Sequence, residues 1–238
     1  MKKYILIFLL FSVSVILYLS FPIRCAEHFV SIDDHTFMLD KKPFYPIALN
    51  YIVTMQGDDK GNIWASSFNG YNAGEKYQYT TKDSCMMQLK AEMDLIKEMG
   101  FNTLRIVRIG EEMLDEQTGN LSVAARVNND HTNMFPLSDT SNYKKYAGAL
   151  AELFDLADKA GLKIIFLVNV QPDVGTTEDH LVKLIKQFKD TPALMAYDLF
   201  NEPLYFDKKE RDKKDVIAIT KRWNHLLKMY APHQLVTI

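Results

Sequence analysis

The chain has 238 residues, of which 47% are hydrophobic and 24% charged, and its formal net charge at pH 7 is −2. This composition is typical of a globular protein with one sizeable core, and it excludes disorder as the main state of the chain. Because Lys and Arg are scattered among Asp and Glu and form no basic stripe, the sequence argues against nucleic acid as a partner.

The first 26 residues have the pattern of an export signal. Lys2 and Lys3 precede an apolar run from Tyr4 to Phe21, which is the order of the basic and hydrophobic regions of a signal peptide. Cleavage near Cys25 would place the mature protein in the periplasm, at the cell surface or outside the cell. A run of this length is also long enough to remain in the membrane as an anchor, which is the alternative to cleavage and the only membrane contact that the sequence suggests.

From residue 29 the chain alternates between predicted strands and predicted helices. A short hairpin is expected at residues 29–39, with a polar turn at residues 33–36. Apolar periodicity, capping residues and the stops at Gly100 and Gly161 then divide the rest of the chain. The predicted strands are 44–50, 102–109, 162–170, 193–200 and 234–238, and the predicted helices are 80–99, 142–160, 176–188 and 212–230.

This alternation predicts an α/β protein with a parallel sheet and helical crossovers. The strand at 162–170 is apolar apart from Lys163 and Asn169, which is too continuous for an amphipathic strand, so both of its faces should be covered. A doubly wound sheet and a closed barrel are the main candidates. No Gly-x-Gly-x-x-Gly follows the first strand and the chain has no Gly-Lys-Ser/Thr loop, so the nucleotide-binding form of the open sheet lacks chemical support. The barrel is therefore favoured.

The triplet Asn-Glu-Pro follows the fourth large strand. The segment Tyr197–Pro203, YDLFNEP, places Asn201 and Glu202 just beyond the strand, and in a barrel the active site lies at the carboxyl ends of the strands. With NTLRI at 102–106 and GLKII at 161–165, this segment resembles the (β/α)8-barrel glycoside hydrolases of clan A, and is most similar to family 5 cellulases and mannanases.

This resemblance implies a retaining hydrolase that cleaves a β-linked glycan without a metal or other cofactor. Such an enzyme needs an acid/base carboxyl group and a nucleophilic carboxylate about 5–5.5 Å apart. Glu202 matches the acid/base, Asn201 the residue that binds the sugar 2-hydroxyl, and Arg105 the arginine that orients the nucleophile. In this family the nucleophile follows the seventh strand, so it is expected to be absent from this chain.

Three further side chains are candidates for contact with the sugar. Tyr205 lies just beyond Glu202, and Asn169 is near the place where family members often carry a histidine. Trp64 has a flat apolar face that could stack on a pyranose. Each candidate also has a structural alternative, since Trp64 could pack within the long segment after the first strand and Arg105 could pair with a structural acid such as Asp198.

The resemblance runs from about residue 29 to the end of the chain. It implies that residues 27–238 are part of one (β/α)8 catalytic domain, truncated after about the fifth strand and preceded by a short N-terminal hairpin. An open barrel leaves unpaired edges and turns its inward side chains toward water. Such a fragment should be marginally stable and inactive. The inward side chains were expected to include Leu104, Ile106, Ile164, Phe166 and Leu199.

Other chemistries find less support in the sequence. The six histidines form neither a His-x-His nor a His-Glu-x-x-His pair, which argues against a metal-dependent hydrolase. The Gly-x-Ser-x-Gly elbow of a serine hydrolase is absent. The remaining alternatives are a barrel that binds carbohydrate without cleaving it, and an inactive fragment that lacks the nucleophile.

Overall fold

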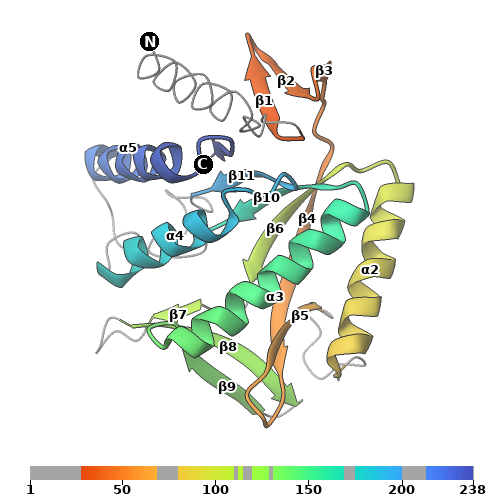
Figure 1. The fold of residues 1–238 in the computed structure, drawn as a ribbon, viewed down its shortest axis with the longest axis vertical. Coiled ribbons are helices and arrows are strands. Elements are labelled where there is room, and N and C mark those ends of the chain that lie inside the picture. Colours follow the sequence, from red (N-terminus) through yellow and green to blue (C-terminus); the bar gives the residue numbers. More distant parts are fainter. Residues whose placement is uncertain are drawn as a thin grey trace, which may run out of the picture.

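The computed structural model describes residues 28–68, 80–109, 112–114, 120–128, 131–168, 175–199 and 213–237. Within these residues, parallel strands form a curled sheet that resembles an open half-barrel (Figure 1). The parallel strands, in chain order, are β4 (Ala48–Gly57), β6 (Thr103–Ile109), β10 (Lys163–Leu167), β11 (Leu194–Asp198) and β12 (Leu235–Thr237). The predicted α/β class is therefore confirmed.

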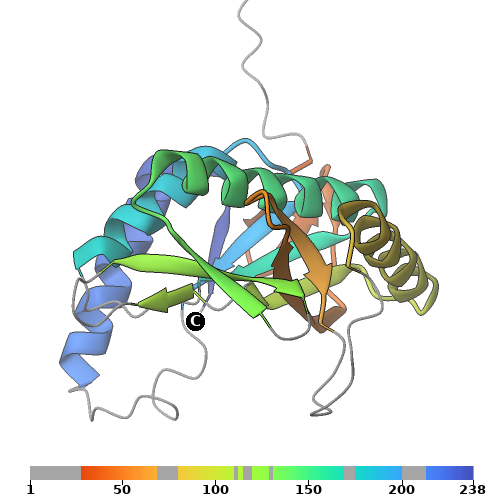
Figure 2. The ribbon, with the colours of Figure 1, turned by 90° about the horizontal axis from the view of Figure 1, so that it is seen from below.

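Helices lie along one side of this sheet, which we call its outer face (Figure 2). They are α2 (Lys82–Glu98), α3 (Thr140–Lys159), α4 (Gly175–Phe188) and α5 (Lys213–Tyr230). Local signals fix several of their ends. Thr81 forms a capping box with Ser84 at the start of α2, and Asp139 accepts two backbone N–H groups at the start of α3. Gly100 and Gly161 follow these helices with φ of 93° and 68°, a conformation that favours glycine.

The main hydrophobic core lies between the outer face of the sheet and the helices. Five side chains that were expected from the sequence to face the barrel interior belong to this core instead, so that expectation is wrong. They are each at most 3% exposed: Leu104, Ile106, Ile164, Phe166 and Leu199. Successive side chains of a strand point to opposite faces, so Leu104 and Ile106 cannot share the face of Arg105.

An N-terminal antiparallel sheet packs on the same strands near the ends where they begin. It consists of β1 (Val30–Asp33), β2 (Thr36–Leu39) and β3 (Lys42–Pro43), with Val30 opposite Leu39. Val30 is 1% exposed and clusters with Met195 and Ala196 of β11. The Lys163 ammonium group, at the start of β10, donates hydrogen bonds to the carbonyl oxygens of His28 and Pro192. The hairpin thus covers the amino-terminal ends of β10 and β11.

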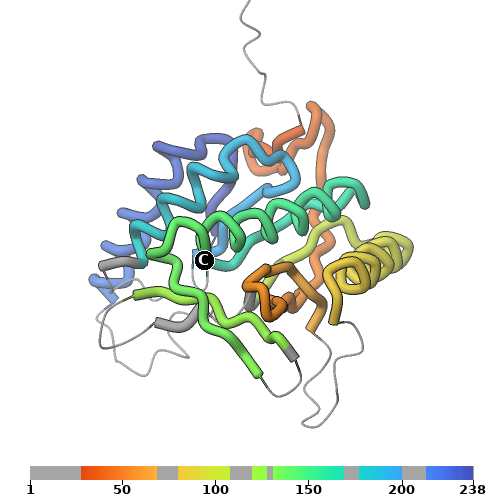
Figure 3. Tube along the Cα trace, turned by 60° about the horizontal axis from the view of Figure 1, so that its bottom comes forward, coloured from red at the N-terminus to blue at the C-terminus, as the bar shows by residue number. Residues whose placement is uncertain are grey.

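Besides the two-residue β3, four strands among the described residues were not predicted from the sequence. They are β5 (Ile63–Ser67), β7 (Glu112–Leu114), β8 (Leu121–Asn128) and β9 (His131–Pro136). β5 pairs with β4 in antiparallel orientation and contacts both α2 and α3. β8 pairs with the end of β4 in parallel, and β7 and β9 flank β8. The β7–β9 ribbon is therefore an insertion between the second parallel strand and α3, and its trace runs directly into that helix (Figure 3).

Two glycines should respond in opposite ways to alanine. A Cβ at Gly57 would lie 2.6 Å from the backbone oxygen of Asn62, whereas a Cβ at Gly148, within α3, would meet nothing within 4 Å. We expect Gly57→Ala to lower the free energy of unfolding by about 1–3 kcal/mol. Gly148→Ala should raise it by about 0.5–1 kcal/mol, because glycine is a poor helix former. Urea unfolding of the matched pair measures both changes, and equal stability of the two variants would contradict the β4–β5 register.

Candidate active site

The candidate site lies where three neighbouring parallel strands end. β6 ends at Ile109, β10 at Leu167 and β11 at Asp198. In barrels and open α/β sheets, the carboxyl ends of parallel strands are where reacting side chains collect. The segments that follow β10 and β11 fall outside the described residues, and with them four of the predicted site residues: Asn169, Asn201, Glu202 and Tyr205.

Arg105 of β6 and Asp198 of β11 form an ion pair across the intervening strand. The Nε and NH2 atoms of Arg105 lie 2.8 Å and 2.5 Å from Oδ2 of Asp198. Between them, Ile165 of β10 is aligned with Arg105, and Leu167 with Asp198. The long arginine side chain therefore spans β10 on the inner face, opposite the helix-covered face. The pairing of Arg105 with Asp198, which the sequence offered as the structural alternative, is therefore present.

Asn50 brings a third strand to this ion pair. It is aligned with Arg105 in the β4–β6 register, and its Oδ1 accepts a hydrogen bond from NH1 of Arg105 at 3.4 Å. Acceptors from β4 and β11 thus contact opposite parts of one guanidinium group. Because a guanidinium group is planar and its donors are fixed in direction, two such acceptors define its orientation.

The carboxylate of Asp198 is almost completely buried. Its side chain is 3% exposed, whereas that of Arg105 is 25% exposed. A buried carboxylate is costly unless it is paired, and Arg105 supplies the pairing charge. The Nε and NH2 groups of Arg105 both contact Oδ2 of Asp198, and Oδ1 is buried without a hydrogen-bond partner among the described residues.

A second cation, Lys163, lies at the amino-terminal end of β10. Burial lowers the pKa of the Lys163 ammonium group, while the negative charges of Asp158 and Asp40 act in the opposite direction. Its hydrogen bonds to His28 and Pro192 hold it near the N-terminal hairpin. Lys163 therefore belongs to the amino-terminal end of the sheet, and Arg105 carries the positive charge toward the carboxyl end.

Trp64 is not available as a sugar platform in this arrangement. It lies in β5, its side chain is only 4% exposed, and its strand contacts α2 and α3. The structure thus favours packing, which was the alternative for this residue. Trp64 is left out of the site proposed below.

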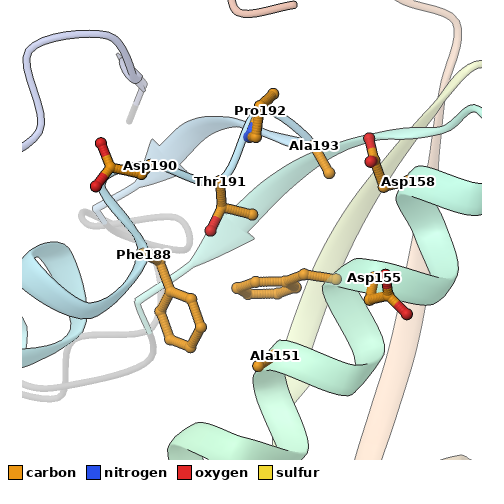
Figure 4. Close-up of a pocket in the computed structure, with 9 residues that line it drawn as sticks. Ala151, Asp155, Asp158, Phe188, Asp190, Thr191, Pro192 and Ala193 are labelled. Atoms are coloured by element: carbon orange, nitrogen blue, oxygen red, sulfur yellow. The ribbon is translucent and has the colours of Figure 1, made fainter. Parts of the chain in front are cut away.

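A separate cavity of about 250 Å³ lies on the other side of the sheet (Figure 4). The residues that line it include Phe154, Phe188 and three aspartates, Asp155, Asp158 and Asp190. It opens beside the turn before β11 and therefore lies at the opposite end of that strand from Asp198. This cavity does not belong to the candidate active site.

Two absences hold for the part of the chain that the structure describes. No three His, Cys, Asp or Glu side chains in it are grouped so that they could hold a metal ion. None of its helices combines the length and apolar character needed to cross a membrane. The N-terminal segment that was predicted to be a signal peptide or anchor lies outside the described residues.

No family model matches the chain, and no curated protein matches it by sequence. Solved structures do match. An endo-1,4-beta-mannanase from Rhizomucor miehei has a TM-score of 0.53 and 15% identity, over 87% of this chain and 59% of that one. A glycoside hydrolase family 5 mannosidase from the same organism has a TM-score of 0.50 and 17% identity, over 89% and 55%. A beta-glucanase from Saccharophagus degradans, solved with cellotetraose, has a TM-score of 0.50 and 15% identity, over 88% and 53%.

These matches concern the fold, because identities of 15–17% are too low to carry more. The predicted resemblance to the family 5 barrels is confirmed at this level. The chain spans between 53% and 59% of the length of these three structures.

Removal of Arg105 should be more harmful to stability than removal of the whole ion pair. Arg105→Met leaves the Asp198 carboxylate buried without its counter-charge, so we expect a loss of about 2–4 kcal/mol, toward the low end because the guanidinium group is partly exposed. Adding Asp198→Asn to Arg105→Met removes the unpaired charge and should restore part of this loss. Urea unfolding of the four proteins in the double-mutant cycle measures the coupling. A double variant no more stable than Arg105→Met would contradict the buried pair.

Proposed function

We propose that the protein is a glycoside hydrolase that cleaves a β-linked glycan with retention of the anomeric configuration. One observation carries this proposal: in the sequence, Asn201 and Glu202 are three and four residues beyond Asp198, the last residue of β11, which pairs with Arg105 in a half-barrel. The fold shared with mannanase and glucanase barrels supports it.

The chain length limits how far Glu202 can lie from the ion pair. Four residues of extended chain span at most about 14 Å, so Glu202 lies no farther than that from Asp198 along the backbone. A contact of the Arg105 guanidinium group with Asp198 and an acid/base within this length of chain are compatible with both groups binding one sugar chain. The bound therefore supports the proposal that Arg105 and Glu202 act in one active site.

Each proposed residue has a distinct chemical role. Glu202 donates a proton to the leaving glycosidic oxygen and later accepts one from water. Asn201 binds the sugar 2-hydroxyl, a contact that strengthens as the ring approaches the oxocarbenium ion. The Arg105 guanidinium group orients the nucleophilic carboxylate and favours its ionised form through its positive charge. In this proposal the nucleophile belongs to a part of the whole protein outside these residues, and Tyr205 and Asn169 contact the substrate.

The proposed substrate class is a β-linked mannan or glucan. The solved mannanases and the glucanase that share the fold are named for such polymers. Polysaccharides do not cross membranes, so an enzyme of this kind has to meet them outside the cytoplasm. The basic and apolar residues at 2–21, interpreted as an export signal or membrane anchor, are consistent with that location.

Glu202→Gln tests the proposal in the whole natural protein. On an unactivated polysaccharide the variant should lose about 10²–10⁴-fold in kcat, because general acid assistance is removed. On an aryl glycoside with an acidic leaving group, bond cleavage should be affected much less, since that group leaves without protonation. Glu98→Gln, the same substitution at an exposed position of α2, is the matched control and should keep wild-type rates.

Two outcomes separate the alternatives. Full activity of Glu202→Gln on polysaccharide would refute the assignment of the acid/base. Saturable polysaccharide binding by the wild-type protein without any turnover would identify a carbohydrate-binding barrel instead of an enzyme.

A further inference from the structure

We propose that Asp198 is a positioning residue of this site, which sets both the orientation of the Arg105 guanidinium group and the net charge that it presents. The proposal rests on the proposed function and adds a residue to it. Asp198 itself is buried at the end of β11 and acts through Arg105.

The backbone holds Asp198 at a fixed height in the sheet. Its neighbours in the parallel registers are Leu167 of β10 and Thr237 of β12. Its carbonyl oxygen also accepts a hydrogen bond from Val168, and the next residue, Leu199, donates one to Thr237. Because β11 is paired on both sides here, the carboxylate is attached to the least adjustable part of the site.

Arg105, by contrast, reaches its position through a long side chain with several rotatable bonds. Two of its donors converge on a single oxygen of Asp198, and a third contacts Asn50, which is exposed on β4. The buried acceptor constrains the guanidinium group more strongly than the exposed one, since water competes for Asn50 and is excluded from Asp198. Asp198 therefore decides where the guanidinium group lies.

The same contact sets the local charge. The Asp198 carboxylate offsets the positive charge of Arg105, and the other described side chains aligned with the pair are uncharged: Asn50, Ile165, Leu167 and Thr237. Lys163, the other cation on β10, is bound to carbonyl oxygens at the far end of the strand. Without the carboxylate, the site would therefore gain one net positive charge.

Asparagine at position 198 isolates this charge. It has nearly the same shape as aspartate and keeps an acceptor for Arg105, but it removes one negative charge beside the guanidinium group. A net positive charge favours the ionised form of a nearby carboxyl group and lowers its pKa. An acid/base that must be protonated to act would then lose its proton at lower pH. A residue that only supports the fold would change the melting temperature and leave the pH profile in place.

The experiment measures kcat, KM and the pH profile of kcat/KM for the whole natural protein and three variants. In Asp198→Asn we expect kcat to fall by up to about 10²-fold with a smaller change in KM, as for other losses of alignment. The basic limb of the profile should move to lower pH, by on the order of one unit or less. Asp198→Glu keeps the charge and should leave the basic limb near its wild-type position. Asp190→Asn, at an exposed position before β11, is the control and should behave as wild type.

A second route covers the case in which Asp198→Asn does not fold. Asp198→Glu keeps the charge and extends the side chain by one methylene group, which displaces the acceptor of Arg105, so kcat should fall several-fold with an unshifted pH profile. Wild-type kcat and an unshifted profile in Asp198→Asn would overturn the proposal, as would wild-type kcat in Asp198→Glu if the first variant is unfolded. Either result together with an inactive Glu202→Gln variant refutes only the role of Asp198, whereas an active Glu202→Gln variant refutes the proposed function itself.

Discussion

The contact between Arg105 and Asp198 links the fold of this protein to its proposed chemistry. A carboxylate that is 3% exposed needs a counter-charge, and the cation comes from two strands away, across β10. The pair therefore requires the correct register of β6, β10 and β11 at once. The pair also requires the helices to cover the face of the sheet opposite to the guanidinium group. Leu104 and Ile106, the neighbours of Arg105, then enter the core while the guanidinium group stays on the inner face.

Much of the scaffold was predictable because its signals are local. Capping residues such as Thr81 and glycines such as Gly100 mark helix ends regardless of what packs around them. The insertion was missed although its signal is present: in β8, Leu121, Val123 and Ala125 alternate with Ser122 and Arg126, and the first three are in the core. β5 offered no such signal, since all five of its residues are buried, a pattern that short strands share with buried helical turns. The prediction for Leu104 and Ile106 was wrong because it treated the two faces of the strand as equivalent. Arg105 lies between these two residues, so its side chain points to the face opposite to theirs.

The candidate site was predictable in kind and only partly in geometry. The sequence identified Arg105, and it offered Asp198 as a possible partner. Whether these two side chains pair depends on the alignment of Ile165 with Arg105 and of Leu167 with Asp198. No local sequence pattern encodes this long-range register. Asn169, Asn201, Glu202 and Tyr205 remain predictions from the sequence. Trp64 shows the limit of such reasoning, because the flat side chain that suits a sugar is equally suited to a core, and here it is buried.

The proposed mechanism requires a nucleophile close enough to the acid/base to attack the same sugar directly. In a retaining hydrolase the two carboxyl groups are about 5–5.5 Å apart, whereas an inverting enzyme holds them about 6.5–9.5 Å apart to admit a water molecule. Proton NMR of the first product formed by the whole natural protein from a β-linked oligosaccharide distinguishes the two mechanisms. For a retaining enzyme we expect the β-anomer to appear first and then to equilibrate with the α-anomer. Initial release of the α-anomer would contradict the proposed mechanism.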